Sequence, residues 1–314
     1  MAVPSFGAAT TMPSEANDEP AAAGGGKNVV HNKQGIDMLH GRIWTKVLRF
    51  ALPVAATGIL EQLFNASGIM IVGNFSQSDG TAAVAAVGSN APVTGLILNL
   101  FIGIALGANV VIANAIGRGS REAVRNAVHT SIVTALIGGV IVAIIGELLA
   151  GPLLGMLNVT ADVFPLALAY LRIYLIGMPV ILLYNFETAI FRSIGDTQAP
   201  LAVLAISGVL NVTMGLIFVV LFHWGVSGVA TATVIANVVS SMILLYRLVH
   251  TDAAIHVDLR EFGIDWFTLR QILRIGLPAG VQSAVFAVAN IIIQAAINSL
   301  GTVVMAASSA AFKI

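Results

Sequence analysis

The chain is a succession of long apolar runs, most of them separated by short polar segments. About twenty residues at a rise of roughly 1.5 Å span the hydrocarbon layer of a bilayer, which is about 30 Å thick. Backbone polar groups in hydrocarbon must be satisfied within their own segment, so such runs predict transmembrane helices. We predict seven helices: 46–72, 83–116, 124–149, 163–194 (long and bent), 200–222, 226–248 and 268–300. The pattern predicts an all-α integral membrane protein.

Composition supports the same class of protein. Hydrophobic residues make up 57% of the chain and charged residues 10%, whereas soluble proteins carry about 25% charged residues. The net charge is zero, which gives no reason to expect a nucleic-acid partner. The sequence holds no cysteine, no glycine-rich phosphate loop and no HExxH motif, and we find no credible nucleophile with its base. We therefore expect no enzyme and no cofactor; the expected partners are membrane lipid and a small organic molecule.

Residues 1–42 differ from the rest of the chain. They mix Ala, Gly, Ser, Pro and scattered charge without an apolar period, which predicts a disordered tail. They lack the apolar core of a signal peptide. Met38 is an alternative to Met1 as the true start of the protein.

The basic residues alternate between the polar segments. They stand before the first predicted helix, after the second, after the fourth and around the connection after the sixth, whereas the other three connections hold none: Arg42, Lys46, Arg49, Arg118, Arg121, Arg125, Arg192, Arg247, Arg260, Arg270 and Arg274. Cytoplasmic loops of membrane proteins carry such an excess of Lys and Arg. We expect a multi-pass protein of the plasma membrane with its amino terminus in the cytoplasm.

The sequence repeats itself after six predicted helices. Residues 48–53 (LRFALP) return as 273–278 (LRIGLP), Asn65 returns as Asn290, and residues 80–81 (Gly-Thr) return as 301–302. An even number of helices gives both copies the same orientation, as in the parallel repeats of alternating-access transporters. We therefore expect a first six-helix lobe at 43–250, a cytoplasmic connection at 251–267, and the start of a second lobe at 268–314. On this interpretation the chain is truncated and a second lobe is missing.

Four short segments carry a resemblance to a known family: 62–65 (QLFN), 71–75 (IVGNF), 85–88 (AAVG) and 191–197 (FRSIGDT). The chain resembles the MATE transporters, the multidrug and toxic compound extrusion family, from about Trp44 onward. The resemblance implies twelve helices in two lobes around a central cavity. It also implies export of organic, often cationic, compounds driven by inward flow of protons or sodium ions.

Two departures from the family pattern concern the coupling ion. Many members resemble FNxxDxxxVGR in the first helix, whereas here Gly68 and Asn74 stand at the acidic and basic places. Coupled members often resemble NxxxD in the fifth helix; Asn211 is kept here and Gly215 replaces the acid. The resemblance thus implies that the usual coupling carboxylates of this lobe are absent, while Asn211 remains a candidate.

Three other carboxylates lie inside the apolar runs. Acids within membrane spans are expensive and commonly functional. We hypothesise that Glu61 and Glu187 face one cavity and carry ion coupling or recognition of a cationic substrate. The equally weighted alternative is a structural acid hydrogen-bonded across helices. For Glu147 we favour a structural pair with Arg172, since both are predicted near the same end of their helices.

Uncharged polar residues within the helices could line a cavity or link helices by hydrogen bonds: Asn65, Asn99, Asn109, Asn185, Asn211, Thr213 and Asn237. Three functions remain open at this stage. A MATE-type exporter leads, and a flippase of lipids or lipid-linked oligosaccharides of the same superfamily follows. A truncated, inactive membrane protein is the third. A strongly cationic cavity would favour the flippase.

Overall fold

The computed structural model describes residues 43–75, 80–157, 159, 161–258 and 263–299. The predictions for the tail, for Met38 and for Gly301-Thr302 lie outside this range. So does the side chain of Asn290, although its backbone is helical.

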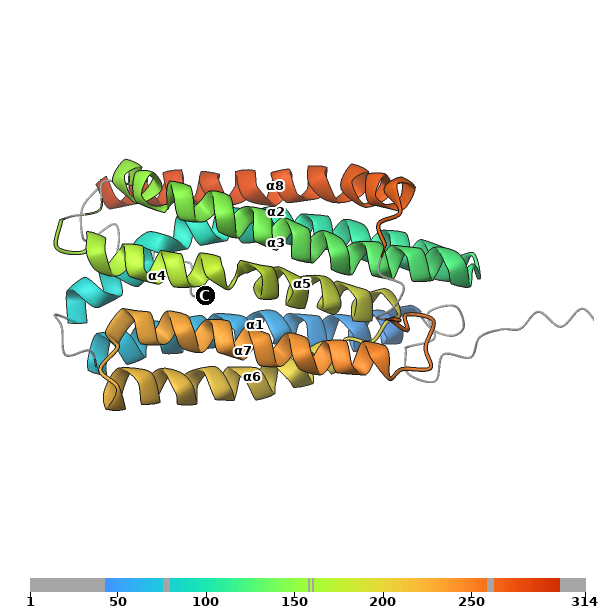
Figure 1. The fold of residues 1–314 in the computed structure, drawn as a ribbon, viewed down its shortest axis with the longest axis horizontal. Helices are drawn as coiled ribbons and strands as arrows, with labels where there is room; N and C mark the ends of the chain where they lie inside the picture. Colours follow the sequence, from blue (N-terminus) through green and yellow to red (C-terminus); the bar gives the residue numbers. More distant parts are fainter. Residues whose placement is uncertain (1–42, 76–79, 158, 160, 259–262, 300–314) are drawn as a thin grey trace, which may run out of the picture. The chain divides into compact units, whose positions relative to one another are not determined.

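The described chain is built from long helices (Figure 1): α1 (Ile43–Phe75), α2 (Gly80–Gly117), α3 (Arg121–Met156), α4 (Phe164–Ile176), α5 (Met178–Ser193), α6 (Gln198–Leu216), the π-helical turn η1 (Ile217–Leu221), α7 (Gly225–Val249) and α8 (Trp266–Ser299). Among the described residues, 6 helices are long and apolar enough to cross a membrane, and counting the bent pair α4 and α5 as one span gives 7. The all-α membrane class is confirmed, and this count matches the predicted number.

The fourth predicted helix is broken where its sequence predicts bending. α4 and α5 meet at Gly177 with an angle of 53°. Pro179 stands in the first turn of α5, where a residue without a backbone N–H is tolerated. A Cβ atom at Gly177 would collide with the side chain of Val234 on α7. The bend therefore also brings the backbone close to α7.

Short connections are set by local capping. Gly195 ends the α5 segment at φ 80°, and the Asp196 side chain accepts hydrogen bonds from the N–H groups of Gln198 and Ala199, at 3.1 and 3.0 Å. Gly195 thus stops one helix and Asp196 caps the next. Asp265 likewise begins α8 by accepting hydrogen bonds from the backbone of Phe267 and from Thr268. The Thr268 hydroxyl bond lowers the pKa of the Asp265 carboxyl.

One helix end lies beyond its predicted place. The sequence predicts that the third helix ends at Leu149, whereas α3 continues to Met156 through Pro152. Packing explains the extension, because Ala150 and Leu154 are fully buried in a cluster that includes residues of α4. Tertiary contacts on both sides of Pro152 outweigh its missing backbone donor.

The helices form two groups with the bent pair between them (Figure 1). α2, α3 and α8 pack together, α1, α6 and α7 pack together, and α4 and α5 contact helices of both groups. Two clusters of buried apolar side chains fill the interior, one around Ile112, Val128 and Phe186 and the other around Val72 and Leu175.

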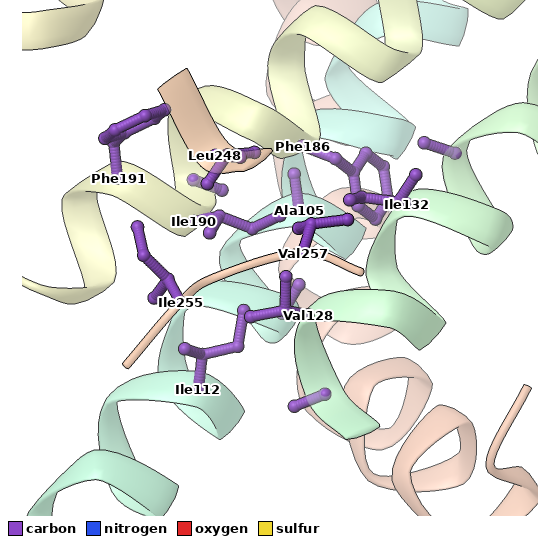
Figure 2. Packing of buried hydrophobic residues seen from close by; sticks show 14 of the residues in the cluster. Ala105, Ile112, Val128, Ile132, Phe186, Ile190, Phe191, Leu248, Ile255 and Val257 are labelled. Atoms are coloured by element: carbon purple, nitrogen blue, oxygen red, sulfur yellow. The ribbon is translucent and has the colours of Figure 1, made fainter. Parts of the chain in front are cut away.

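The connection after α7 is inserted into the first cluster. Ile255 and Val257 are fully buried and lie between α2, α3 and α5 (Figure 2). Two backbone hydrogen bonds fix the segment to α3: the N–H of Asp258 donates to Nε2 of His129 at 3.2 Å, and the N–H of Asp265 donates to the hydroxyl of Thr130 at 3.1 Å. The connection is thus part of the packed structure at this end of the bundle.

The outward faces of the helices are apolar. Leu148, Val209, Met242 and Leu106 expose 74%, 65%, 65% and 52% of their surface. A soluble protein rarely exposes so many large apolar side chains on contiguous faces. Such exposure agrees with helices that are long and apolar enough to cross a membrane.

Candidate substrate cavity

A cavity of about 170 Å³ opens between α1, α2, α4, α5, α6 and α7. We call it the Glu61 cavity, because Glu61 is the carboxylate that lines it among the described residues. Its other lining residues are Phe64, Asn65, Leu98, Ile102, Tyr174, Ile181, Tyr184, Asn185, Leu204, Ser207, Gly208, Asn211, Thr233, Ala236, Asn237 and Ser240.

A second cavity of about 340 Å³ adjoins the first. We call it the Gly68 cavity; it is lined along α1 by Gln62, Gly68 and Ile69, and by residues of α2, α4, α6 and α7. Six residues line both cavities: Phe64, Asn65, Leu98, Tyr174, Asn211 and Thr233. The two spaces therefore form one cleft through the α1–α7 bundle, with Asn211 at the junction.

The charge in this cleft is negative. Neither cavity is lined by Lys, Arg or His within the described part of the chain. The guanidinium of Arg192, near the end of α5, acts electrostatically on Glu61 from outside the lining. A single carboxylate among neutral amides, hydroxyls and aromatic rings is a suitable environment for an organic cation.

Amide side chains present acceptor oxygens to the cleft. Nδ2 of Asn185 donates to the carbonyl of Ile181 at 2.8 Å, and Nδ2 of Asn237 donates to the carbonyl of Thr233 at 2.9 Å. Nδ2 of Asn211 donates to the hydroxyl of Thr233 at 3.4 Å. Because the amide nitrogens are turned to the protein, the amide oxygens are left to accept hydrogen bonds from a bound molecule.

Glu187 does not line the same cavity as Glu61. Its side chain is fully buried, and it is absent from the lining of both cavities. The cavity face of α5 carries Ile181, Tyr184 and Asn185, and at about 100° per residue Glu187 lies to the side of that face, toward α7. The expectation that Glu61 and Glu187 share a cavity surface is therefore not met; Glu61 and Asn211 are brought together instead.

Glu147 and Arg172 lie next to each other, far from this chemistry. Nε of Arg172 is 3.4 Å from Oε2 of Glu147, with the two side chains 55% and 32% exposed. Neither residue lines the Glu61 or the Gly68 cavity. The geometry is that of an ion pair between α3 and α4, the arrangement that the structural interpretation predicts.

The two family positions without an acid lie where the sequence comparison places them. Gly68 lines the cleft, and a Cβ atom there would be 3.2 Å from Cγ1 of Val229. A Cβ atom at Gly215 would be 3.5 Å from Cδ1 of Ile71. Asn74 donates from Nδ2 to the carbonyl of Met70 at 3.0 Å. The cleft thus carries no carboxylate at position 68, and Gly215 lines neither cavity.

The remaining polar candidates separate into two groups. Asn65, Asn185 and Asn237 line the Glu61 cavity. Asn109 instead links helices, since its Nδ2 donates to the carbonyl of Ala189 at 2.9 Å. Asn99 and Thr213 bond to carbonyls of their own helices.

Sequence reasoning did not single out Tyr174, Tyr184, Thr233 or Ser240 as lining residues. A signal for two of them exists: Tyr184 stands one turn before Glu187, and Thr233 stands one turn before Asn237. An aromatic hydroxyl or an alcohol one turn from a polar residue inside an apolar helix indicates a polar face.

Comparison with known proteins identifies the family. The probable multidrug resistance protein YoeA of Bacillus subtilis (strain 168) is 27% identical over 267 residues, which cover 83% of this chain and 57% of YoeA. A multidrug resistance MATE family transporter of the MOP superfamily in its outward-facing conformation matches with a TM-score of 0.75 and 27% identity, over 83% of this chain and 57% of that chain. An inward-facing structure of such a transporter matches with a TM-score of 0.67 and 27% identity, over 76% and 55%.

The chain therefore spans little more than half the length of these relatives. The MatE family model matches residues 53–217, just over half of the 314 residues. This segment contains α2 to α6 whole and most of α1, the helices that supply most of the cleft. The chain belongs to the MatE family of membrane transporters.

Proposed function

We propose that the chain forms a substrate-binding lobe of a secondary exporter of organic cations, which works by alternating access in the plasma membrane. In this proposal the amino terminus lies in the cytoplasm, and export is exchanged for protons or sodium ions. A second lobe facing the cleft completes the binding site. Relatives named as multidrug resistance proteins, and solved in outward- and inward-facing conformations, support this class of function.

The observation that carries the proposal is the lining of the Glu61 cavity. One carboxylate, Glu61, stands among aromatic rings and amide oxygens, with no basic residue in the described lining. Aromatic faces and amide oxygens bind weakly hydrated organic cations. The absence of basic residues from the described lining also argues against the phosphate-bearing substrates of a flippase.

Asn211 has a central place in the proposal. It lines both cavities and is held by Thr233 of the neighbouring helix. A substrate that passes between the Glu61 and the Gly68 cavities must pass its amide. We therefore assign Asn211 to substrate contact, and not to ion coupling by itself, because an amide takes up no proton.

The test uses the purified chain and ethidium as the cationic probe. Glu61→Gln is expected to weaken ethidium binding in detergent by about tenfold, because a charge-assisted contact is worth roughly 1.5–3 kcal/mol. In vesicles, the unchanged chain together with a second lobe is expected to accumulate ethidium under an imposed proton or sodium gradient. The choice of gradient identifies the coupling ion.

Glu122→Gln provides the matched control, since it removes the same charge from an exposed position on the first turn of α3. It is expected to bind ethidium like the unchanged chain. Equal binding by Glu61→Gln and Glu122→Gln would refute the assignment of Glu61. Accumulation of ethidium that is independent of both gradients would refute the proposed exchange.

A further inference from the structure

A group of buried polar side chains adjoins the Glu61 cavity. Glu187 is fully buried, and both of its carboxyl oxygens lack a hydrogen-bond partner in the described structure. The hydroxyls of Tyr184 and Thr188 are likewise buried without completed hydrogen bonds. The Ser241 hydroxyl of α7 faces Glu187, and the Thr188 hydroxyl faces that of Tyr184. A carboxyl group and three hydroxyls thus meet where α5 packs on α7.

This group borders the cavity directly. Tyr184 on α5 and Ser240 on α7 both line the Glu61 cavity. Glu187 lies one turn beyond Tyr184, and Ser241 follows Ser240 in sequence. The carboxyl groups of Glu61 and Glu187 both act electrostatically on the Tyr184 hydroxyl. Tyr184 is therefore the residue of this group that lines the cavity and is also affected by both carboxyl groups.

No cation accompanies Glu187 among the described residues. The groups that act on its carboxyl are the apolar surroundings and Ser241, whereas Arg192 acts on Glu61 and Tyr184. The helices packed around α5 carry no ionisable group on α2 or α6. α3 carries Arg121, Glu122 and Arg125 near its start, His129 bound to the Asp258 N–H, and Glu147 beside Arg172 of α4. The other ionisable groups are Tyr170 and Tyr174 on α4 and Tyr246 and Arg247 in the last turn of α7. A buried carboxylate without a partner is far more costly than the neutral acid.

We propose that Glu187 is a proton-binding site of this lobe, which exchanges its proton with the Glu61 cavity through the hydroxyl of Tyr184. In the release step the Glu187 O–H bond breaks and its proton passes to the phenol oxygen of Tyr184. The phenol's own proton passes to Glu61 or to cavity water, so that Tyr184 is unchanged and one proton moves outward. The proposal rests on the proposed exporter function and names the group that would couple it to protons.

The geometry separates this role from that of a structural acid. A structural acid would be expected to complete hydrogen bonds with its neighbours, whereas three polar side chains here, Tyr184, Glu187 and Thr188, remain without them. Such a group is suited to a carboxyl that alternates between protonated and ionised forms. Ser241 and Thr188 can donate to the carboxylate and to the phenol oxygen when the proton has left.

Infrared difference spectroscopy on the full chain in lipid tests the proposal without requiring transport. The protonated carboxyl band is expected to lose intensity as the pH is raised from about 5 to about 9, the range in which perturbed acids of such sites titrate. Glu187→Gln is expected to remove this titrating band. Glu147→Gln, which makes the same change in the acid paired with Arg172, is expected to leave it in place.

Tyr184→Phe tests the path, since it removes the hydroxyl and keeps the ring. The Glu187 band is expected to persist in this variant and to exchange with heavy water at least about tenfold more slowly, because the relay group is missing. Exchange at the unchanged rate would overturn the role of Tyr184. A band that persists in Glu187→Gln, or one that does not respond to pH in the unchanged chain, would overturn the site itself.

Transport adds an independent readout. Glu187→Gln is expected to abolish accumulation of ethidium driven by a proton gradient while binding stays within about twofold of the unchanged chain. If the unchanged chain, together with a second lobe, fails to accumulate ethidium although the infrared band titrates, the exporter function fails and the proton site stands. Proton-driven accumulation by Glu187→Gln equal to that of the unchanged chain would overturn the coupling role.

Discussion

Glycine sets the distance between α8 and α2. Gly276 and Gly280 on α8 face Gly103 and Gly107 on α2, with backbone against backbone. Each pair has the four-residue spacing that lets membrane helices approach closely and gain van der Waals contact. Gly103 and Gly107 of α2 thus serve packing against α8.

Gly276→Ala is expected to destabilise the chain. Its new Cβ atom would stand 2.6 Å from Cα of Ile104 and 2.8 Å from the carbonyl oxygen of Gly103, so that the helices must separate. Overpacking of this kind costs about 1–3 kcal/mol. Thermal unfolding in detergent measures the loss. Gly95→Ala on α2, where nothing lies within 4 Å of the new atom, is the control, and equal unfolding temperatures for the two variants would contradict the close contact.

At the residue scale, the sequence predicts which residues are candidates better than it predicts which way their side chains point. Glu61 and the Glu147–Arg172 pair are nominated by their charge within apolar runs, and Asn211 is nominated by the family resemblance. The burial of Glu187 behind Tyr184 is not, because all faces of α5 are largely apolar and only the packed neighbours show which face meets the cleft. Polarity therefore nominates residues, and the helix orientation decides their roles.

At the element scale, the connection between α7 and α8 is itself packed into the bundle. The segment between α7 and α8 buries Ile255 and Val257 in the cluster of α2, α3 and α5 (Figure 2). It is also bonded to His129 and Thr130 of α3. The sequence predicts a polar cytoplasmic connection here. Two apolar residues between polar ones do not predict that this segment is buried. The apolar surroundings that bury them come from three other helices.

Ile255→Ala is expected to lower the free energy of unfolding by about 2–5 kcal/mol, the usual cost of a cavity left by a buried Ile. His256→Ala is the matched control, since this exposed side chain stands between the two buried ones. It is expected to change stability by less than about 0.5 kcal/mol. Titration of the helical signal with a denaturing detergent measures both. A similar effect of the two substitutions would show that the segment is not inserted in the bundle.

Helix boundaries that depend on local residues are predicted from the sequence, whereas those that depend on packing between helices are not. The stop at Gly195 and the cap at Asp196 are local and are predicted from residues 192–197. The bend at Gly177 is indicated by Gly and Pro together. The extension of α3 through Pro152 is not predicted, because it depends on contacts of Ala150 and Leu154 with α4. Local chemistry is visible in one sequence, and packing across helices is not.

For the whole molecule, the length of the apolar runs determines the fold class. Apolar runs long enough to cross a bilayer predict the all-α membrane fold and the number of spans, and the ordered short motifs predict the family. The cleft itself requires the structure, since its lining comes from six helices and its negative character depends on which side chains turn inward. The central claim is that lipid surrounds the bundle while water enters the cleft.

Cysteine accessibility tests this claim most directly, because the natural chain contains no cysteine. Asn211→Cys and Val209→Cys place single thiols two residues apart on α6, the first in the cleft and the second on the outward face, where Val209 is 65% exposed. Only a thiol that meets water ionises and reacts with a membrane-impermeant maleimide. In intact membranes we expect rapid labelling of Asn211→Cys and none of Val209→Cys, although Val209 is the more exposed residue. Equal or reversed rates, or an unreactive Asn211→Cys, would contradict a water-filled cleft inside a lipid-covered bundle.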